Sequence, residues 1–158
     1  MAECYDFFAN VAPGGSASNA GLLWLAATST MDFTLVELEI TMDGGSTQYW
    51  PYFQWQIWSG AFTAPTGGSV LTINKASAQS QSRAAVTTGK YGTFTASPTG
   101  GTSITRNKVF YCNQSGEHVQ WPLGREPYYC PVSGGLFLMI TTPASFANNI
   151  AIYGIIEE

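Results

Sequence analysis

Hydrophobic and polar residues alternate along much of this chain with the two-residue period of a β-strand. The clearest case is residues 33–41, where Thr34, Val36, Leu38 and Ile40 alternate with Leu35, Glu37, Glu39 and Thr41. Neighbouring side chains of a strand point to opposite faces, so this segment predicts a half-buried strand with its carboxylates toward solvent or a partner. Gly, Pro and Asn interrupt the chain at short intervals, and no long stretch has a helical period. The pattern predicts an all-β protein.

The remaining apolar segments predict a two-sheet architecture. We expect strands at residues 4–11, 52–58, 70–73, 92–96, 104–112, 117–121, 136–140 and 150–156, a strand or short helical turn at 22–27, and loops at 60–69 and 74–88. Pro51 has no N–H to donate, so its strand should begin at about Tyr52. Roughly eight to ten strands with little helix fit a jelly-roll-like sandwich of two antiparallel sheets, with residues 1–158 as one domain.

The aromatic run at 49–58, YWPYFQWQIW, has two distinct faces. Phe53, Trp55 and Ile57 share one face, which we expect in the core. The other face carries Tyr52, Gln54, Gln56 and Trp58. Two aromatic rings interleaved with two amides are compatible with internal packing, a subunit contact or a glycan site, since aromatic residues concentrate in cores and interfaces alike.

The last two predicted strands are apolar on both faces. In the first, Leu136, Leu138 and Ile140 oppose Phe137 and Met139; in the second, Ile150, Ile152 and Ile156 oppose Ala151, Tyr153 and Ile155. Antiparallel sheets commonly turn one face to water, so we expect another protein subunit to cover the second face. The predicted subunit or capsid interface comprises Tyr52, Trp58, Leu136, Phe137, Leu138, Met139, Ile140, Tyr153 and Ile155.

Composition and charge narrow the classes of function. Hydrophobic residues make up 45% of the chain, which argues against disorder. Charged residues make up only 10%, and the formal net charge is -4. The basic residues are scattered, so nucleic-acid binding is not expected. No segment has the length of a membrane span, and the N-terminal MAECYDFF carries acids where a secretory signal has a basic region.

Candidate chemistry is sparse. The G-x-S-x-G, Walker, H-E-x-x-H and G-x-G-x-x-G motifs are absent. The only histidine, His118, suggests a nucleophilic site with Cys112 and Glu117, or a zinc site with Cys112 and Cys130. Reduced, buried cysteines are the simpler interpretation, and a Cys112–Cys130 disulfide is a weaker alternative.

The acidic pairs also have ordinary interpretations. Glu37 and Glu39 match a glycosidase pair in spacing alone and are expected to be solvated. Glu157 and Glu158 are expected to form a solvated tail. We therefore predict no catalytic residues, no metal and no cofactor.

Five stretches together carry a family resemblance. They are Ala20-Gly21-Leu22-Leu23; Val36-Glu37-Leu38-Glu39-Ile40; Gly67-Gly68-Ser69 with the later Ala84-Ala85-Val86; Trp121-Pro122-Leu123 with Pro127 and Pro131; and Ser133-Gly134-Gly135-Leu136 with the closing Glu157-Glu158. In these features the chain resembles small jelly-roll decoration (cement) proteins of tailed-bacteriophage capsids. The aromatic run at 49–58 and the three cysteines depart from that pattern.

The resemblance implies a non-enzymatic virion protein at the capsid surface, assembled in the host cytoplasm. Such proteins typically form trimers and clamp subunits of the major capsid protein, without nucleic acid or membrane as partner. The alternative is a carbohydrate- or receptor-binding sandwich of a phage tail or fibre, using Tyr52, Trp55 and Trp58.

Overall fold

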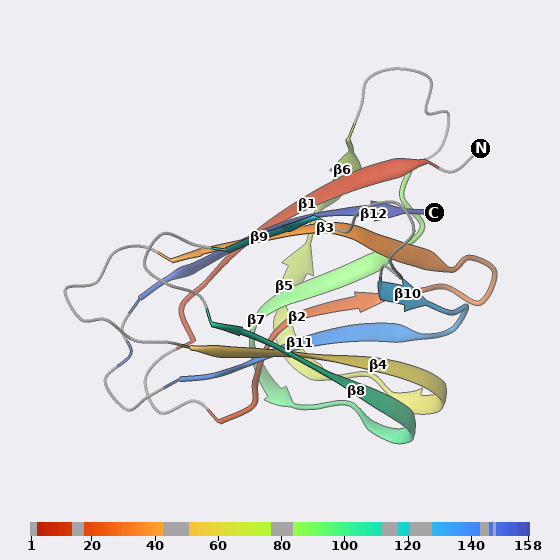
Figure 1. Ribbon diagram of the computed structural model, residues 1–158. Helices are drawn as coiled ribbons and strands as arrows, with labels where there is room; N and C mark the ends of the chain where they lie inside the picture. The colour runs from red at the N-terminus through yellow and green to blue at the C-terminus, as the bar shows by residue number, and fades with distance from the viewer. Residues whose placement is uncertain are drawn as a thin grey trace.

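A computed structural model shows an all-β protein built from two antiparallel sheets packed face to face (Figure 1). It describes residues 3–13, 18–42, 51–76, 84–111, 117–120, 128–142, 146 and 148–158; for 104–111 and 117–120 only the backbone is described. The predicted antiparallel sandwich is confirmed.

Each sheet contains six strands. Sheet A consists of β1 (Cys4–Val11), β3 (Phe33–Met42), β6 (Ile73–Lys75), β9 (Glu117–Gln120), β10 (Tyr128–Cys130) and β12 (Ile150–Glu157), in the order β10-β3-β12-β1-β6 with β9 also paired to β3. Sheet B consists of β2 (Ala20–Ala26), β4 (Tyr52–Thr63), β5 (Thr66–Leu71), β7 (Thr88–Ala96), β8 (Thr99–Tyr111) and β11 (Gly135–Thr141), in the order β5-β7-β2-β11-β4-β8.

The strand pairs have the nested order of a jelly roll. The first strand pairs with the last, β1 with β12; moving inward along the chain, β2 pairs with β11, β3 with β10 and β4 with β8. Successive pairs alternate between the sheets, as in a long hairpin rolled into two layers. The predicted jelly-roll-like order is therefore present.

An insertion between β4 and β8 adds strands that the sequence analysis missed or shortened. β4 continues to Thr63 and β5 begins at Thr66, where a loop was predicted over 60–69. β5 and β7 extend sheet B beside β2, and β6 extends sheet A beside β1. Glycines at 67 and 68 have positive φ, and the β5–β7 register shifts around them, so these turn residues lie within an irregular strand.

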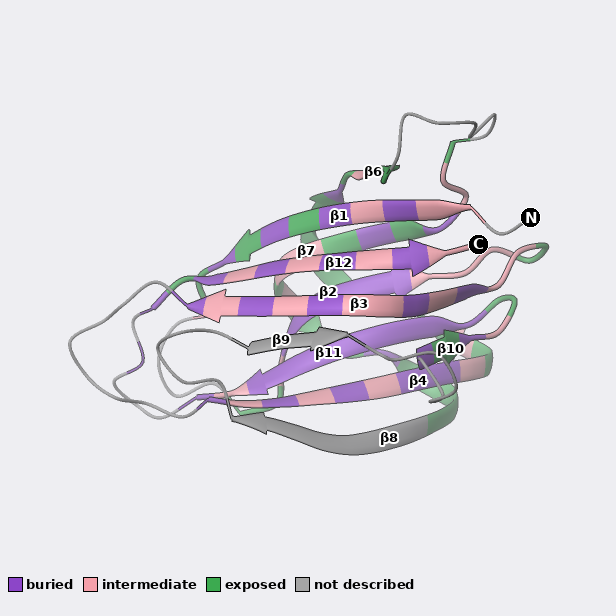
Figure 2. Ribbon diagram, turned by 45° about the horizontal axis from the view of Figure 1, so that its top comes forward, coloured by how far each residue is buried: buried purple, intermediate pink, exposed green. Residues whose placement is uncertain are grey.

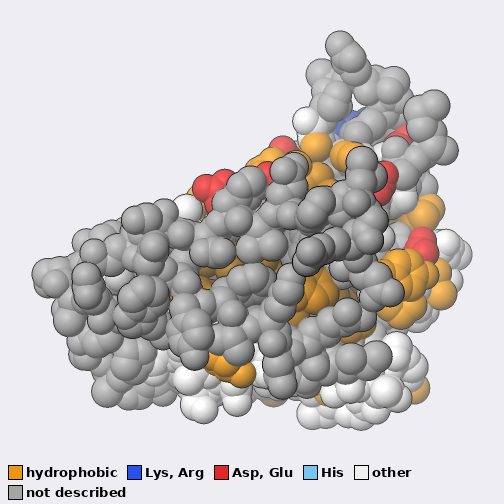
Figure 3. All heavy atoms as spheres, in the orientation of Figure 1, with side chains coloured by type: hydrophobic (Ala, Val, Ile, Leu, Met, Phe, Trp, Pro, Cys, Tyr) orange, Lys and Arg blue, Asp and Glu red, His pale blue; other side chains and the backbone are white. Residues whose placement is uncertain are grey.

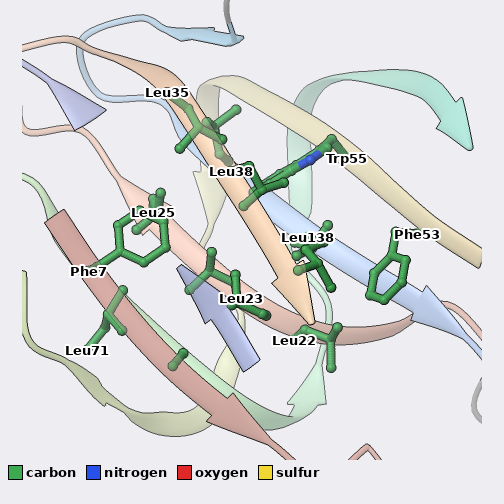
Figure 4. Close-up of a cluster of buried hydrophobic side chains, with 14 of the residues drawn as sticks. Phe7, Leu22, Leu23, Leu25, Leu35, Leu38, Phe53, Trp55, Leu71 and Leu138 are labelled. Carbon is green, nitrogen blue, oxygen red and sulfur yellow. The ribbon is translucent and has the colours of Figure 1, made fainter. Parts of the chain in front are cut away.

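The core lies between the sheets. Large apolar side chains from both layers, including Phe7, Leu23, Leu38, Trp55 and Leu138, point into this space (Figure 4). All five are at most 1% exposed. The predicted core face of the aromatic run, Phe53, Trp55 and Ile57, is confirmed as buried.

A bulge corrects the predicted alternation of β3. Ile155 pairs with Glu37 and the next residue, Ile156, pairs with Leu35, so Val36 is the extra residue. Residues before the bulge therefore point to the opposite faces from those predicted. Leu35 is buried although the alternation grouped it with the glutamates, and Val36 is only half-buried. Glu37 and Glu39 remain half-buried on the outer side.

The C-terminus is anchored, which corrects the prediction of a solvated tail for Glu158. Its carboxylate accepts hydrogen bonds from the backbone N–H of Val86, at 3.0 and 3.1 Å, and of Thr87, at 2.6 Å. Its backbone exchanges two 3.0 Å hydrogen bonds with Glu3. Glu158 therefore connects the end of β12 to the segment that enters β7, and thus sheet A to sheet B.

Candidate functional site

The outer face of β11 is covered by the chain itself. Phe137 and Met139 lie in a second apolar cluster with Trp24 and Trp58, and Phe62 and Phe94 pack against it. Phe137 meets Phe94 edge-on at 5.3 Å between ring centroids and Trp24 at 6.1 Å. Edge-to-face pairs at such distances are favourable beyond the area they bury. We call these six residues the aromatic cover.

The aromatic cover and the core account for the burial of six predicted interface residues. Leu136, Leu138 and Ile140 lie in the main core, and Phe137 and Met139 are part of the aromatic cover; none of the five is more than 4% exposed. Trp58, also a predicted interface residue and also in the aromatic cover, is 8% exposed. The expectation that a neighbouring subunit must cover the second face of this strand is wrong. The pattern of apolar residues in the sequence indicates that both faces of this strand are buried, but it does not indicate which residues cover them.

The outer face of sheet A lacks such a cover within the described residues. Phe8, Tyr153 and Ile155 form its apolar part, and we call this surface, with its flanking carboxylates Asp6, Glu37 and Glu39, the open face. Phe8 is 61% exposed, while Tyr153 and Ile155 are half-buried. Figure 2 shows exposed and half-buried positions alternating with buried ones along β1, β12 and β3. Tyr153 and Ile155, both predicted interface residues, are therefore partly accessible on this face.

Strand register fixes how the open face is arranged. On β12, Tyr153 lies between Phe8 of β1 and Glu39 of β3, and Ile155 lies between Asp6 of β1 and Glu37 of β3. Each apolar side chain in the middle row is therefore flanked by at least one carboxylate. Hydrophobic and acidic side chains also lie side by side over this part of the molecule in Figure 3.

The charged side chains that β1, β3 and β12 place on the open face are all acidic. Partial burial, followed by the charges of Asp6, Glu37 and Glu39, raises the pKa of Tyr153 above its ordinary value. The sequences of β1, β3 and β12 contain no Lys or Arg.

A second candidate site is a polar pocket of about 310 Å³ on the outer side of sheet B. Gln54, Gln56 and Trp58 of β4 and Met139 of β11 contribute to it, together with Asn19, Ser97, Pro98 and Ser103. The indole N–H of Trp58 donates to Oε1 of Gln56 at 3.2 Å. Among its described lining residues the pocket has amides, hydroxyls and apolar surface but no charge, which is the chemistry that binds neutral polar ligands.

Of the three aromatic residues predicted to bind a carbohydrate or receptor, only Trp58 lines this pocket. Trp55 is fully buried in the core, and Trp58 is 8% exposed. Tyr52 is half-buried and does not line the pocket. Asn19 lies far in the sequence from Ser97 and Ser103, so no local sequence pattern identified these pocket residues. On the open face, by contrast, the alternation of β1 could have identified Asp6 and Phe8.

The cysteine candidates lie in different environments. Cys4 and Cys130 are free thiols, the first half-buried and the second buried. Burial raises the pKa of Cys130 to about 12, and burial followed by the charge of Glu157 raises the pKa of Cys4. Cys112 lies outside the described residues, as does the His118 side chain, so the proposed nucleophilic and zinc sites stay untested. Among described residues no His, Cys, Asp and Glu cluster has a metal-binding arrangement.

Comparisons with known proteins give no match to a family model, a curated protein or a solved structure. Within the described ranges, no helix has the length and apolar character needed to cross a bilayer.

Proposed function

We propose that the chain is a non-enzymatic structural protein of a tailed-bacteriophage virion, a decoration (cement) subunit that binds and stabilises the major capsid shell. Two lines of support converge: the sequence resemblance to such proteins, and a strand order that has the jelly-roll arrangement the resemblance implies. The proposed location is the capsid surface, after assembly in the host cytoplasm.

The observation that carries this proposal is the open face. A regular sheet surface with an exposed Phe8 beside Tyr153 and Ile155 is suited to lie against another protein. Interfaces are rich in aromatic residues at their centres and polar at their rims, and the open face has that composition. The chain is also poor in charge, at 10%, as expected for a protein with part of its surface covered in an assembly.

The proposed function predicts binding to particles. Purified chain added to capsids assembled without it should sediment with them and saturate at a fixed ratio to the major capsid protein. Capsids with bound chain should withstand heating or low salt better than bare capsids. Failure of the chain to bind such shells would contradict the proposed function.

The proposed trimer has its own test. Light scattering should give about three times the chain mass of 17.0 kDa at micromolar concentration. A mass of one chain under these conditions would contradict the trimer while leaving capsid binding to be judged by sedimentation.

The polar pocket favours a second candidate function, a carbohydrate-binding module. Gln54, Gln56 and Asn19 can pair with sugar hydroxyls, and Trp58 provides a small apolar contact. A neutral saccharide should quench or shift tryptophan fluorescence, and Gln56→Ala should reduce that response. A glycan array without hits would remove this candidate.

A further inference from the structure

We propose that the polar pocket of sheet B recognises the acetamido group of an N-acetylated amino sugar, through hydrogen-bond donors in its lining and a small apolar floor. This inference rests on the second candidate function, carbohydrate binding, and specifies which chemical group of the saccharide the pocket selects. It does not depend on how the chain binds a capsid.

Three neighbouring strands and a turn build the pocket. β11, β4 and β8 lie side by side in sheet B (Figure 1). Gln56 and Trp58 share the outer face of β4, because they lie two residues apart on one strand, and Trp58 pairs in register with Ser103 of β8. Ser97 and Pro98 form the connection between β7 and β8. A volume of about 310 Å³ lies at the lower end of the range for ligand pockets, which suits a single sugar residue.

The side-chain amide of Gln56 is held with its nitrogen available to a ligand. An indole N–H can only donate, so the Gln56 atom that Trp58 contacts at 3.2 Å is the carbonyl oxygen Oε1. This hydrogen bond fixes which end of the amide faces Trp58 and uses a lone pair of the oxygen. Neither N–H of the Gln56 amide has an acceptor among the described residues. Gln56 therefore offers mainly donors.

Asn19 offers the same polarity from another part of the lining. Its backbone N–H donates to Oγ1 of Thr141 at 3.1 Å, and that hydroxyl donates to Oδ1 of Asn19 at 3.3 Å. The φ of Asn19 is 49°, a left-handed conformation in which Asn is enriched among non-glycine residues. Both hydrogen bonds tie Asn19 to the end of β11 and engage its side-chain oxygen. The amide nitrogen is thus the group that Asn19 can direct to a ligand.

The apolar part of the lining is small. Trp58 is 8% exposed and Met139 is 4% exposed, and Pro98 is also buried. So little of the Trp58 ring is accessible that it cannot stack on the face of a sugar ring. The accessible apolar surface is instead suited to a group of the size of a methyl.

An acetamido group combines the features that this lining selects. Its carbonyl oxygen accepts hydrogen bonds and carries no proton, so the amides of Gln56 and Asn19 can satisfy it without leaving a donor unpaired. Its methyl can contact the apolar floor. Its N–H can donate to a hydroxyl of Ser97 or Ser103, both of which are exposed and line the pocket. A sugar hydroxyl brings a proton that needs a further acceptor and has no methyl for the floor.

The experiment compares ligands that differ only in this group. Isothermal titration calorimetry measures binding of the methyl glycosides of N-acetylglucosamine, glucose and glucuronic acid, and of the corresponding galacto series. Saturation-transfer NMR shows which ligand protons lie against the protein. Gln56→Glu keeps an oxygen that can accept from Trp58 and replaces the amide donors with a second oxygen. The matched control is Asn74→Asp, the same amide-to-acid change at an exposed position of sheet A. Circular dichroism and thermal unfolding establish that both variants are folded.

The proposal predicts that, in at least one of the two series, the acetamido sugar binds about tenfold more tightly than the other two, with the strongest saturation transfer to its acetyl methyl. Gln56→Glu should weaken this binding about tenfold, and Asn74→Asp should bind like the wild type. Equal or tighter binding of a sugar without the acetamido group, or an unchanged affinity of Gln56→Glu, would overturn this inference while keeping carbohydrate binding. Absence of binding by all six glycosides would overturn both.

Discussion

β11 and β12 look alike in sequence but differ in structure. Both carry apolar residues on successive positions, and both lie in the interior of their sheets. All residues of β11 from Gly135 to Ile140 are buried, because the aromatic cover closes its outer side. On β12 only alternate residues are buried, and its outer side chains remain partly exposed between carboxylates. Consecutive apolar residues therefore occur in two structural settings: the chain covers both sides of β11, and it leaves the outer side of β12 partly exposed.

The largest expected difference in stability is between substitutions on the outer side of β11 and on the outer side of β12. Phe137→Ala removes a fully buried ring from the aromatic cover and should lower the free energy of unfolding by about 3–5 kcal/mol. Phe8→Ala removes an exposed ring of the same size and should cost less than about 1 kcal/mol, mainly through its contact with Tyr153. Urea unfolding measures both. Equal losses would contradict the distinction between the faces.

Substitution of the two adjacent glutamates at the end of β12 should give a smaller difference in the free energy of unfolding. Glu158→Ala leaves the backbone N–H groups of Val86 and Thr87 without their carboxylate acceptor and should cost about 1–3 kcal/mol. Glu157, on the outer side of the same strand, is the matched control, and Glu157→Ala should change stability by about 0.5 kcal/mol or less. Chemical unfolding at neutral pH checks this prediction. An equal cost for the two changes would show that the carboxylate of Glu158 is not an anchor.

Ionisation of Cys130 should have the smallest effect on stability at neutral pH, and it should lower stability at alkaline pH. Its folded pKa of about 12 lies above the ordinary thiol value of 9.0. Below pH 9 both states are protonated and stability is full; above it the unfolded thiol ionises while the folded thiol keeps its proton. Stability should fall between pH 9 and 12, by at most about 1.4 kcal/mol per pH unit from this group.

Other groups also titrate in that range, so Cys130→Ala is the control for this prediction. Its unfolding free energy should decline less steeply with pH than that of the wild type. Identical slopes would contradict burial of the thiol. At pH 8, an alkylating reagent should modify Cys4 before Cys130, because Cys4 is half-buried on β1 and Cys130 is 0% exposed.

The sequence was sufficient for the fold class and for several strands because these depend on local periodicity. β3, the start of β4 at Tyr52 and the core face of Phe53 and Trp55 followed from alternation and from the proline before them. The bulge at Val36 could not be predicted, because it depends on pairing with β12, more than a hundred residues away in sequence.

The candidate surfaces were harder to predict for the same reason. The aromatic cover draws on β2, β4, β7 and β11, and only their sheet order brings Trp24, Phe94 and Phe137 together. The polar pocket likewise joins Asn19 to Ser97 and Ser103. Tyr153 and Ile155 were predicted as interface residues from their strand alone, and their flanking carboxylates became evident only from the register with β1 and β3.

Hydroxyl-radical footprinting of the free chain and of the chain on capsids tests the central claim most directly. The chain itself covers the outer side of β11, and we propose that the outer side of β12 binds a partner on the capsid. We predict that Phe8 and Tyr153 are oxidised in the free chain and protected on the capsid, with Phe137 and Met139 protected in both states. The claim would be contradicted if Phe137 and Met139 were oxidised in the free chain and protected on the capsid while the oxidation of Phe8 stayed the same.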